Sequence, residues 1–502
     1  MERQPDLLLA IDQGTSAVKV VLFDLTGRIV AAAERETPIR HPLPTWIESD
    51  AERWWESVVV GIRNVLDRPG VRAEQIRGIG VCGFMHTLVP IDAAGRAICP
   101  PLLWPDQRCA QETDDLAPYA EVFVRTSGRP PTTMSSVPRL RWLGRHDPNA
   151  LTTARAFLLP KDFLRFRLTG AIATDRRDAG GTGLLDAASG QWSEDLLNLA
   201  GVRLAQMPPI RRADELAGTV TTAAAAETGL VPGTPVVIGS GDWFSTIVGS
   251  GCCLPDRACM YVGTAGIIGA FTSAEELDRL GRTAYMGSVT ATGSALRWVR
   301  NLFLGDSDQS AEAGPGDSYA RICAEAETSE PGARGLYFLP HLMGERGGTM
   351  RPGARGVLYG LTLAHRRPDV LRAVLEGSAL WLRQTTEPHL DTIKPRDLVL
   401  FGGGARSPLW RAIFAAVFGR PLLVPDVSEG GALGVAMLAA VGTGLRRSYR
   451  DLAHEWVRIV GVESPDASLV ERYARIYRDF REVEAVTATL EGKGQPQREG
   501  QA

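Results

Sequence analysis

A chain of 502 residues is too long for one hydrophobic core of ordinary size, so its length predicts at least two domains. Hydrophobic residues make up 44% of the chain and charged residues 23%, and the 54 glycines indicate many tight turns. A net charge of −3 offers no basic excess for nucleic acid, and no stretch approaches the roughly 20 apolar residues of a membrane span. The seven cysteines form no CxxC pair, so neither a disulfide framework nor a zinc site is indicated, and we expect a cytoplasmic protein.

Three strand-like runs open the chain, at Leu7–Ile11, Lys19–Phe23 and Ile29–Glu34. Their short connections predict an antiparallel meander. After them, Ser49–Asp50 can cap a helix that ends near Leu66, because tryptophan and aliphatic residues recur there at helical spacing.

The turn between the first two strands carries more polar side chains than a hairpin needs. It lacks the GxxxxGK[ST] pattern and leads into a strand, so it is not a Walker P-loop. Backbone N–H groups and hydroxyls in such a turn can bind phosphate oxygens, and a carboxylate at a strand end can hold Mg²⁺ through water. A decorated hairpin explains the turn equally well. The residues concerned are Asp12, Gly14, Thr15, Ser16 and Lys19.

A buried strand is predicted at Ile76–Val81, and Met85 and His86 follow its carboxyl end. A lone histidine in such a place is more often a core or surface residue than a ligand-binding one. Residues 100–160 are rich in proline, and we expect them to be irregular apart from a short amphipathic piece near Arg139–Leu143.

The segment LLWPDQR combines Trp104, Asp106 and Arg108. Such a cluster can bind a polyol, because a carboxylate accepts hydroxyl protons while an indole covers C–H surface. An ordinary ion pair within the loop is the alternative reading.

Asp242, in IGSGDWF, is the acid most suggestive of catalysis. Glycines just before it leave room for a ligand near the backbone, and its carboxylate could take a proton from an attacking hydroxyl. It could equally cap the helix that is predicted to start at Trp243. We expect a domain boundary near residue 253.

The second half repeats the theme of a strand followed by a glycine-rich turn. Ala258–Phe271 contains a Gly-Thr turn, and Leu398–Gly404 runs into GGGARS, where the backbone could approach a flat ring or a phosphate. Helices are predicted at Pro408–Phe418 and Glu429–Gly442, and the residues from about Val486 onward turn polar.

Taken in order, these segments resemble the FGGY carbohydrate kinases, which are members of the actin-like ATPase superfamily. The resemblance covers about residues 7–445, and further matching segments are LLPKDFLRFRLTG, TDRRDAGGTGLLD and ARGVLYGLTLAHRR. It implies an α/β fold of two ribonuclease-H-like domains, with ATP and sugar bound in the cleft between them. We expect an N-terminal domain at 1–253, a C-terminal nucleotide-binding domain at 254–485 and a disordered tail at 486–502.

The resemblance also implies roles for individual residues. Asp242 is expected to be the catalytic base, and Asp12 the acid associated with Mg²⁺. The first phosphate loop is expected at Gly14, Thr15, Ser16 and Lys19, and the sugar contacts at Met85, His86, Trp104, Asp106, Asp242 and Trp243. The remaining nucleotide contacts are expected at Gly263, Thr264, Gly266, Gly293, Gly403, Gly404, Ala405 and Ser407.

Within the family, the xylulokinases are most similar, which predicts transfer of the γ-phosphate of ATP to a terminal hydroxyl of a ketopentose such as D-xylulose. The chain departs from their usual pattern at GFMHT, at WPDQR, at Trp243 and at GERGGTMRP. Thr87 is closer to the MHS of gluconate-type members, so an aldonate, another sugar or a polyol is the alternative substrate. An actin-like nucleotide switch and a non-catalytic sugar-binding regulator are alternatives of other classes. The family also suggests a homodimer.

Overall fold

The computed structural model describes residues 5–43, 45–252, 257–272, 283–304, 315–345, 351 and 353–491. Contacts within the chain divide it into two compact units. Unit 1 comprises Met1–Gly249 and Gly430–Trp456, and unit 2 comprises Ser250–Glu429 and Val457–Ala502.

This division differs from a single boundary near residue 253. Residues 430–456, which were expected in the C-terminal domain, belong to unit 1. The reason is that helix α16 (Gly430–Gly442) packs on strands β1 (Leu7–Gln13) and β4 (Ile76–Gly83) of unit 1. The helix predicted at this place is therefore present, but it completes the first unit.

Unit 1 is built on a sheet with the strand order β3-β2-β1-β4-β10-β9, and β11 also pairs with β4. Strands β1, β2 and β3 form the predicted antiparallel meander, whereas β4 runs parallel to β1 and β10 runs parallel to β4. The strands not yet located are β2 (Ala17–Asp24), β3 (Ile29–Glu36), β9 (Leu216–Thr219), β10 (Pro235–Val237) and β11 (Ser240–Gly241).

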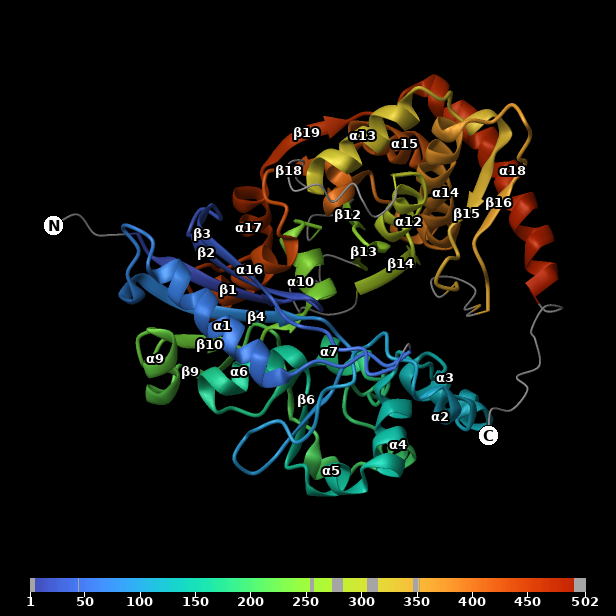
Figure 1. Cartoon of the computed structure of the whole chain (residues 1–502). Coiled ribbons are helices and arrows are strands. Elements are labelled where there is room, and N and C mark those ends of the chain that lie inside the picture. The colour runs from blue at the N-terminus through green and yellow to red at the C-terminus, as the bar shows by residue number, and fades with distance from the viewer. Residues whose placement is uncertain are drawn as a thin grey trace. The chain divides into compact units, whose positions relative to one another are not determined.

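Helices cover both faces of this sheet (Figure 1). Helix α1 (Ala51–Leu66) begins where the sequence predicts, because the Asp50 side chain accepts a hydrogen bond from the backbone N–H of Glu52. Its buried tryptophan and aliphatic side chains join alternate residues of β1 and β2 in one core. Helix α16 lies on the opposite face, toward which the other alternate residues of β1 point.

The proline-rich region is more regular than expected, because its apolar side chains form a second core. Leu116, Phe123 and Leu140 pack there with residues of the segment that follows. The amphipathic piece predicted near Arg139–Leu143 lies within α4. The elements of this region are α2 (Ala110–Asp114), α3 (Ala120–Ser127), α4 (Ser136–His146), α5 (Pro148–Thr153) and β6 (Ala156–Leu158).

The remaining elements of unit 1 follow or flank these. They are β5 (Val89–Ile91), α6 (Pro160–Thr169), β7 (Thr174–Asp175), α7 (Arg176–Gly181), α8 (Glu194–Ala200), β8 (Ile210–Arg211), α9 (Thr222–Thr228), α10 (Asp242–Gly249) and α17 (Tyr449–Trp456).

Unit 2 repeats the plan of unit 1. Its main sheet has the order β14-β13-β12-β17-β18-β19, in which an antiparallel meander is again followed by two parallel strands and one antiparallel edge strand. The strands are β12 (Arg257–Val262), β13 (Gly266–Phe271), β14 (Thr283–Val289), β17 (Asp397–Phe401), β18 (Leu422–Pro425) and β19 (Ile459–Glu463). The faint two-fold theme of the sequence is thus a repeat of topology.

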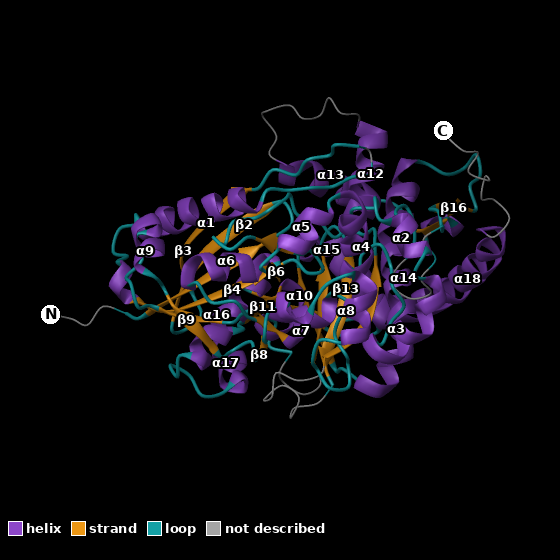
Figure 2. Ribbon diagram, turned by 90° about the horizontal axis from the view of Figure 1, so that it is seen from below, coloured by secondary structure: helices purple, strands orange, loops and turns teal. Residues whose placement is uncertain are grey.

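The helices of unit 2 surround this sheet, and in Figure 2 the strands of both units lie among helices. They are α12 (Gly293–Leu304), α13 (Pro315–Glu327), α14 (Arg367–Ile393), α15 (Pro408–Phe418) and α18 (Ala467–Glu491), and a hairpin joins β15 (Tyr337–Leu339) to β16 (Val357–Tyr359). Residues 486–491, which were expected in a disordered tail, belong to helix α18, and 492–502 lie outside the described residues. Among the helices that the structure describes, none is both long and apolar enough to cross a membrane.

Candidate active site

The predicted catalytic residues of unit 1 lie at the carboxyl ends of its parallel strands. Asp12 on β1 is in register with Cys82 on β4, and Cys82 is in register with Ser240 on β11. Asp242 follows directly after β11. Ligands of open α/β sheets bind at this edge, because the loops that leave the strands there can shape a pocket.

Asp12 lies in a place suited to a charged ligand. It pairs in register with Lys19 across the β1–β2 hairpin, and directly opposite residues of antiparallel strands point to the same face. The amino terminus of α16 is close by, since a Cβ on Gly431 would lie 2.9 Å from Asp12 Oδ2. The positive end of a helix favours a carboxylate, so this contact stabilises ionised Asp12.

Asp242 begins helix α10, and its carboxylate Oδ1 accepts a hydrogen bond of 2.7 Å from the backbone N–H of Trp243. Asp242 is therefore the first residue of this helix, one position before the predicted start at Trp243, and its side chain bonds within the first turn. Burial, together with the negative charge of Asp12, raises the pKa of Asp242 to about 7. A carboxylate with a pKa near neutrality is well matched to proton transfer, so the place of Asp242 in the first turn of α10 is compatible with a catalytic role.

Met85 and His86 lie beside the Asp242 segment. A Cβ on Gly241 would lie 2.7 Å from Met85 Cγ, so Met85 packs against the backbone just before Asp242. His86 has a φ of 72°, a conformation that few non-glycine residues adopt. Its carbonyl oxygen accepts hydrogen bonds from Arg139 Nη2 and Ser136 Oγ, at 2.6 Å and 2.7 Å, which hold this conformation in place.

The ring of His86 has a defined protonation state. Nδ1 lies 2.6 Å from the carbonyl oxygen of Gly181, and since a carbonyl only accepts, Nδ1 must carry the proton. Burial and the nearby charges of Arg129 and Arg139 lower the pKa of His86 to about 3. The ring is therefore neutral at physiological pH, and Nε2 is a hydrogen-bond acceptor that suits a hydroxyl.

The LLWPDQR segment connects to the phosphate-loop residues through Trp104. Trp104 Nε1 donates a hydrogen bond of 3.2 Å to Thr15 Oγ1, which joins two predicted site segments that are 89 residues apart. Asp106 has a different environment. Its side chain is fully buried, forms a salt bridge of 2.8 Å with Arg108 Nη2, and accepts a hydrogen bond from the backbone N–H of Ile47.

These contacts favour the ion-pair reading for Asp106. Arg108 also contacts Glu48 at 2.7 Å and lies over the ring of Trp46, so the segment is held from several sides. Asp106 is therefore placed to hold the shape of the loop that carries Trp104. Trp243 is half-buried and Ser16 is exposed, as expected for residues at the rim of a site.

The predicted nucleotide contacts of unit 2 gather at the matching edge of its sheet. The Gly263–Thr264 turn follows β12, and Gly403–Ala405 follow β17, which is parallel to β12. The start of α12 holds the first turn: the N–H of Gly293 donates to the Gly263 carbonyl at 2.9 Å.

The small residues of these turns have different surroundings. A Cβ on Gly293 would lie 2.6 Å from the Gly263 oxygen, and one on Gly404 would overlap Val262, whereas Gly403 has open space before it. Gly266 packs against Val289 within the sheet. Ser407 caps α15 by accepting from the N–H of Trp410. Gly403 is therefore the position at which a ligand could approach the backbone most closely.

Sequence reasoning missed two contributions to the site of unit 1. The first is the amino terminus of α16, which approaches Asp12 across more than 400 residues of sequence; its signal is the Gly430–Gly431 pair before an apolar run. The second is helix α7, whose Gly181 carbonyl fixes the ring of His86. The segment containing α7 was part of the family resemblance, but no site role was assigned to it.

Comparisons with known proteins identify the family of the chain. Residues 7–249 match the N-terminal domain and residues 245–443 the C-terminal domain of the FGGY family of carbohydrate kinases. The xylulose kinase of Escherichia coli (strain K12) is 34% identical over 495 residues, covering 95% of this chain and 97% of that protein. The autoinducer-2 kinase of Photorhabdus laumondii is 31% identical over 517 residues, covering 97% and 96%.

Solved structures give the same result. The crystal structure of xylulose kinase from Rhodospirillum rubrum superposes with a TM-score of 0.85 at 31% identity, covering 97% of this chain and 100% of that one. Both family domains are matched, relatives are similar over nearly the whole length, and the fold is the α/β fold of these kinases. The chain therefore belongs to the FGGY family of carbohydrate kinases and is an ATP-dependent phosphotransferase.

Proposed function

We propose that this kinase transfers the γ-phosphate of ATP to a terminal hydroxyl of a ketopentose such as D-xylulose, with Asp242 as the catalytic base. The observation that carries the assignment of the base is the carboxyl of Asp242, whose pKa is raised to about 7 at the strand ends beside Met85 and Asp12. Near full-length similarity to proteins named xylulose kinase supports the choice of acceptor.

Phosphoryl transfer to a hydroxyl depends mainly on positioning and on charge stabilisation. Asp242 accepts the proton of the sugar hydroxyl while that oxygen attacks the γ-phosphorus, and the bond to the β-phosphate oxygen breaks to release ADP. Nε2 of His86 accepts a hydrogen bond from a second sugar hydroxyl, and Met85 provides an apolar wall. Trp104 orients the first phosphate loop through its bond to Thr15.

The residues present fit a magnesium ion held mainly by ATP. Among the described residues no group of three or more His, Cys, Asp or Glu could hold a metal, and Mg²⁺ in kinases commonly uses one or two carboxylates with phosphates and water. Asp12 would hold it through water, and a cation there would offset the repulsion that raises the pKa of Asp242. When bound, Mg²⁺ neutralises charge on the transferring phosphate.

ATP phosphates are the proposed ligands of Gly14, Thr15, Ser16 and Lys19 in unit 1. In unit 2 the turns at Gly263, Thr264, Gly403, Gly404 and Ala405 are proposed to contact the nucleotide, while Gly266, Gly293 and Ser407 hold those turns in shape. A cytoplasmic location and a homodimer remain expectations from the family.

An aldonate is a less favoured acceptor than a ketopentose. The sequence argument for it used the hydroxyl of Thr87, but this side chain is fully buried, and its oxygen has no hydrogen-bond partner among the described residues. Because the chain is also similar to an autoinducer-2 kinase, the assay below includes acceptors other than ketopentoses.

The experiment is a coupled ADP-release assay of the purified protein over ketopentoses, aldonates, polyols and deoxy sugars. We expect strong stimulation by a ketopentose, with the Asp242→Asn variant as the inactive control. Stimulation by an aldonate or polyol alone would refute the acceptor. Stimulation by no acceptor would favour a nucleotide switch or a sugar-binding regulator.

A further inference from the structure

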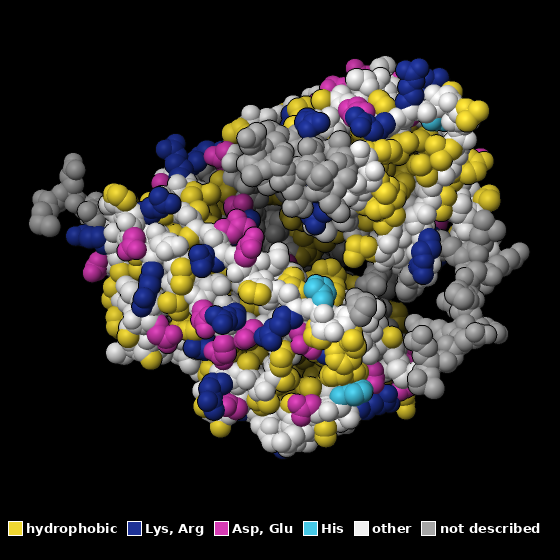
Figure 3. Space-filling model, viewed as in Figure 1, with side chains coloured by type: hydrophobic (Ala, Val, Ile, Leu, Met, Phe, Trp, Pro, Cys, Tyr) yellow, Lys and Arg dark blue, Asp and Glu magenta, His cyan; other side chains and the backbone are white. Residues whose placement is uncertain are grey.

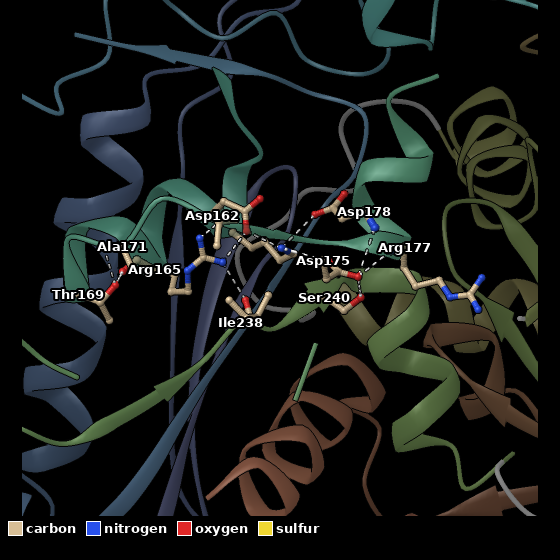
Figure 4. A network of polar contacts seen from close by, with 11 residues as sticks. Asp162, Arg165, Thr169, Ala171, Asp175, Arg177, Asp178, Ile238 and Ser240 are labelled. Carbon is tan, nitrogen blue, oxygen red and sulfur yellow. Dashed lines mark hydrogen bonds and ion pairs between the residues drawn. The ribbon is translucent and has the colours of Figure 1, made fainter. Parts of the chain in front are cut away.

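A buried cluster of charged side chains, outside the contacts described so far, is linked to Ser240, which stands two residues before the proposed base (Figure 4). Lys161, at the start of α6, is completely buried. Its Nζ lies 2.5 Å from Asp162 Oδ1, 3.2 Å from Asp175 Oδ1 and 3.7 Å from Asp178 Oδ2. Arg165 Nη1 contacts Asp162 Oδ1 as well, at 2.7 Å. These five charged residues come from α6, β7 and α7.

The charges of this cluster balance if Asp178 is neutral. Burial and the neighbouring carboxylates raise the pKa of Asp178 well above its ordinary value despite Lys161. Burial would lower the pKa of Lys161, yet the carboxylates around it raise that pKa instead. Two cations, Lys161 and Arg165, then face two carboxylates, Asp162 and Asp175. Buried ion pairs contribute little net stability compared with apolar packing, but their contacts fix geometry.

Asp175 is the member of the cluster that reaches the active-site segment. Its Oδ2 accepts a hydrogen bond of 2.8 Å from Ser240 Oγ, and also bonds from the backbone N–H groups of Arg177 and Asp178. Its Oδ1 faces Lys161. One carboxylate therefore joins β11, the amino terminus of α7 and the start of α6, and Figure 4 shows Ser240 beside Asp175.

Ser240 stands two residues before Asp242, on a strand of only two residues. Strand β11 pairs with β4 at Cys82 and Gly83, and the backbone N–H groups of the two residues before β11 donate to the carbonyl oxygens of Glu215 and Ala213. Ser240 itself is completely buried, and its bond to Asp175 crosses 65 residues of sequence. This bond therefore adds a side-chain restraint, beside those backbone contacts, on the segment that carries Asp242.

We propose that Asp175 is a positioning residue for Asp242, acting through the hydroxyl of Ser240. The proposal rests on the proposed function, in which Asp242 is the base. Helix α7 extends the effect, because the carboxylate that caps its first turn belongs to Asp175 and its last residue, Gly181, holds the ring of His86. Asp175 thus helps to position both the base and a proposed sugar contact.

The test is the Ser240→Ala variant, which removes the hydroxyl and little volume. We expect kcat to fall about ten-fold or more, with small changes in KM for ATP and in thermal stability, because a displaced base slows the chemical step. The matched control is Thr174→Val, one residue before Asp175, which removes a buried hydroxyl that has no hydrogen-bond partner among the described residues. A wild-type kcat in Ser240→Ala, or an equal loss in Thr174→Val, would overturn the proposal.

A double-mutant cycle separates this bond from general damage. Asp175→Ala and Ser240→Ala should each lower kcat, and the double variant should lose far less than the product of the two losses, because each substitution removes the hydrogen bond between these two side chains. Independent losses that multiply would contradict the proposal. Asp242→Asn is measured in parallel: if it keeps kcat, the proposed base is wrong, whereas its inactivity beside an unaffected Ser240→Ala refutes only the positioning role.

Discussion

The pH dependence of catalysis tests the electrostatic description of the site in unit 1. A carboxyl with a pKa of about 7 is ionised in about 1% of molecules at pH 5 and in about 90% at pH 8. At its ordinary pKa of 3.8 it would already be about 90% ionised at pH 5. Since a general base must be ionised, we expect kcat/KM to fall close to 100-fold from pH 8 to pH 5.

The Asp12→Asn variant then tests whether the charge of Asp12 contributes to the raised pKa of Asp242. The charge of Asp12 raises the pKa of Asp242, so removing that charge should move the acid limb to lower pH. Burial contributes more to the raised pKa than Asp12 does. The acid limb of the variant should therefore still lie at a higher pH than that of an aspartate with an ordinary pKa.

The measurement is kcat/KM for the sugar at low, fixed Mg²⁺-ATP, from pH 5 to pH 8.5, in wild type and Asp12→Asn. Titration of ATP affects both proteins equally, so it cancels in the difference between the two profiles. Normalised profiles that superpose would refute the coupling of Asp12 to Asp242. A wild-type profile that is flat down to pH 5 would refute the raised pKa.

Three further predictions follow from single contacts. Gly431→Ala places a Cβ 2.9 Å from Asp12 Oδ2 and should raise the Mg²⁺ concentration needed for half-maximal rate about ten-fold; an unchanged magnesium dependence would contradict the role of Asp12. Gly293→Ala places a Cβ 2.6 Å from the Gly263 oxygen and should raise KM for ATP about ten-fold but leave sugar binding intact, as steady-state kinetics and calorimetry would show. Asp242→Asn should raise the melting temperature more at pH 8 than at pH 5. The pKa of Asp242 is raised in the folded state, so ionisation of its carboxyl lowers the stability of the wild type as pH rises through about 7. An equal change in melting temperature at both pH values would count against the raised pKa.

Local patterns in the sequence were sufficient for much of the fold. The opening meander, the helix capped by Asp50, and the strand and turn before Gly403 all depend on nearby residues, and the structure has them as predicted. The proline-rich region was predicted less well, because its helices are stabilised by a core that forms only when distant segments meet.

Contacts between distant segments also explain what was missed in the site. The Gly430–Gly431 pair indicates a helix start, but it does not reveal that α16 returns to unit 1 and places Gly431 against Asp12. The two readings of Asp106 could not be separated without its contacts to Arg108 and Ile47. The role of Asp175 likewise depends on a hydrogen bond that spans 65 residues.

The surface adds no evidence for a polyanionic or strongly charged partner. On the face shown in Figure 3, basic and acidic side chains are interspersed, in agreement with the net charge of −3. The proposed binding of the ATP phosphates by local turns does not require a strongly basic surface.

The turnover of Asp242→Asn, measured together with its affinity for ATP, tests the central claim most directly. The amide can still accept from the N–H of Trp243, but it cannot take a proton from the sugar. We predict a loss of about 100-fold to 10,000-fold in ketopentose-dependent ADP release, with ATP affinity close to that of wild type. Ordinary turnover in this variant would contradict the assignment of Asp242 as the base.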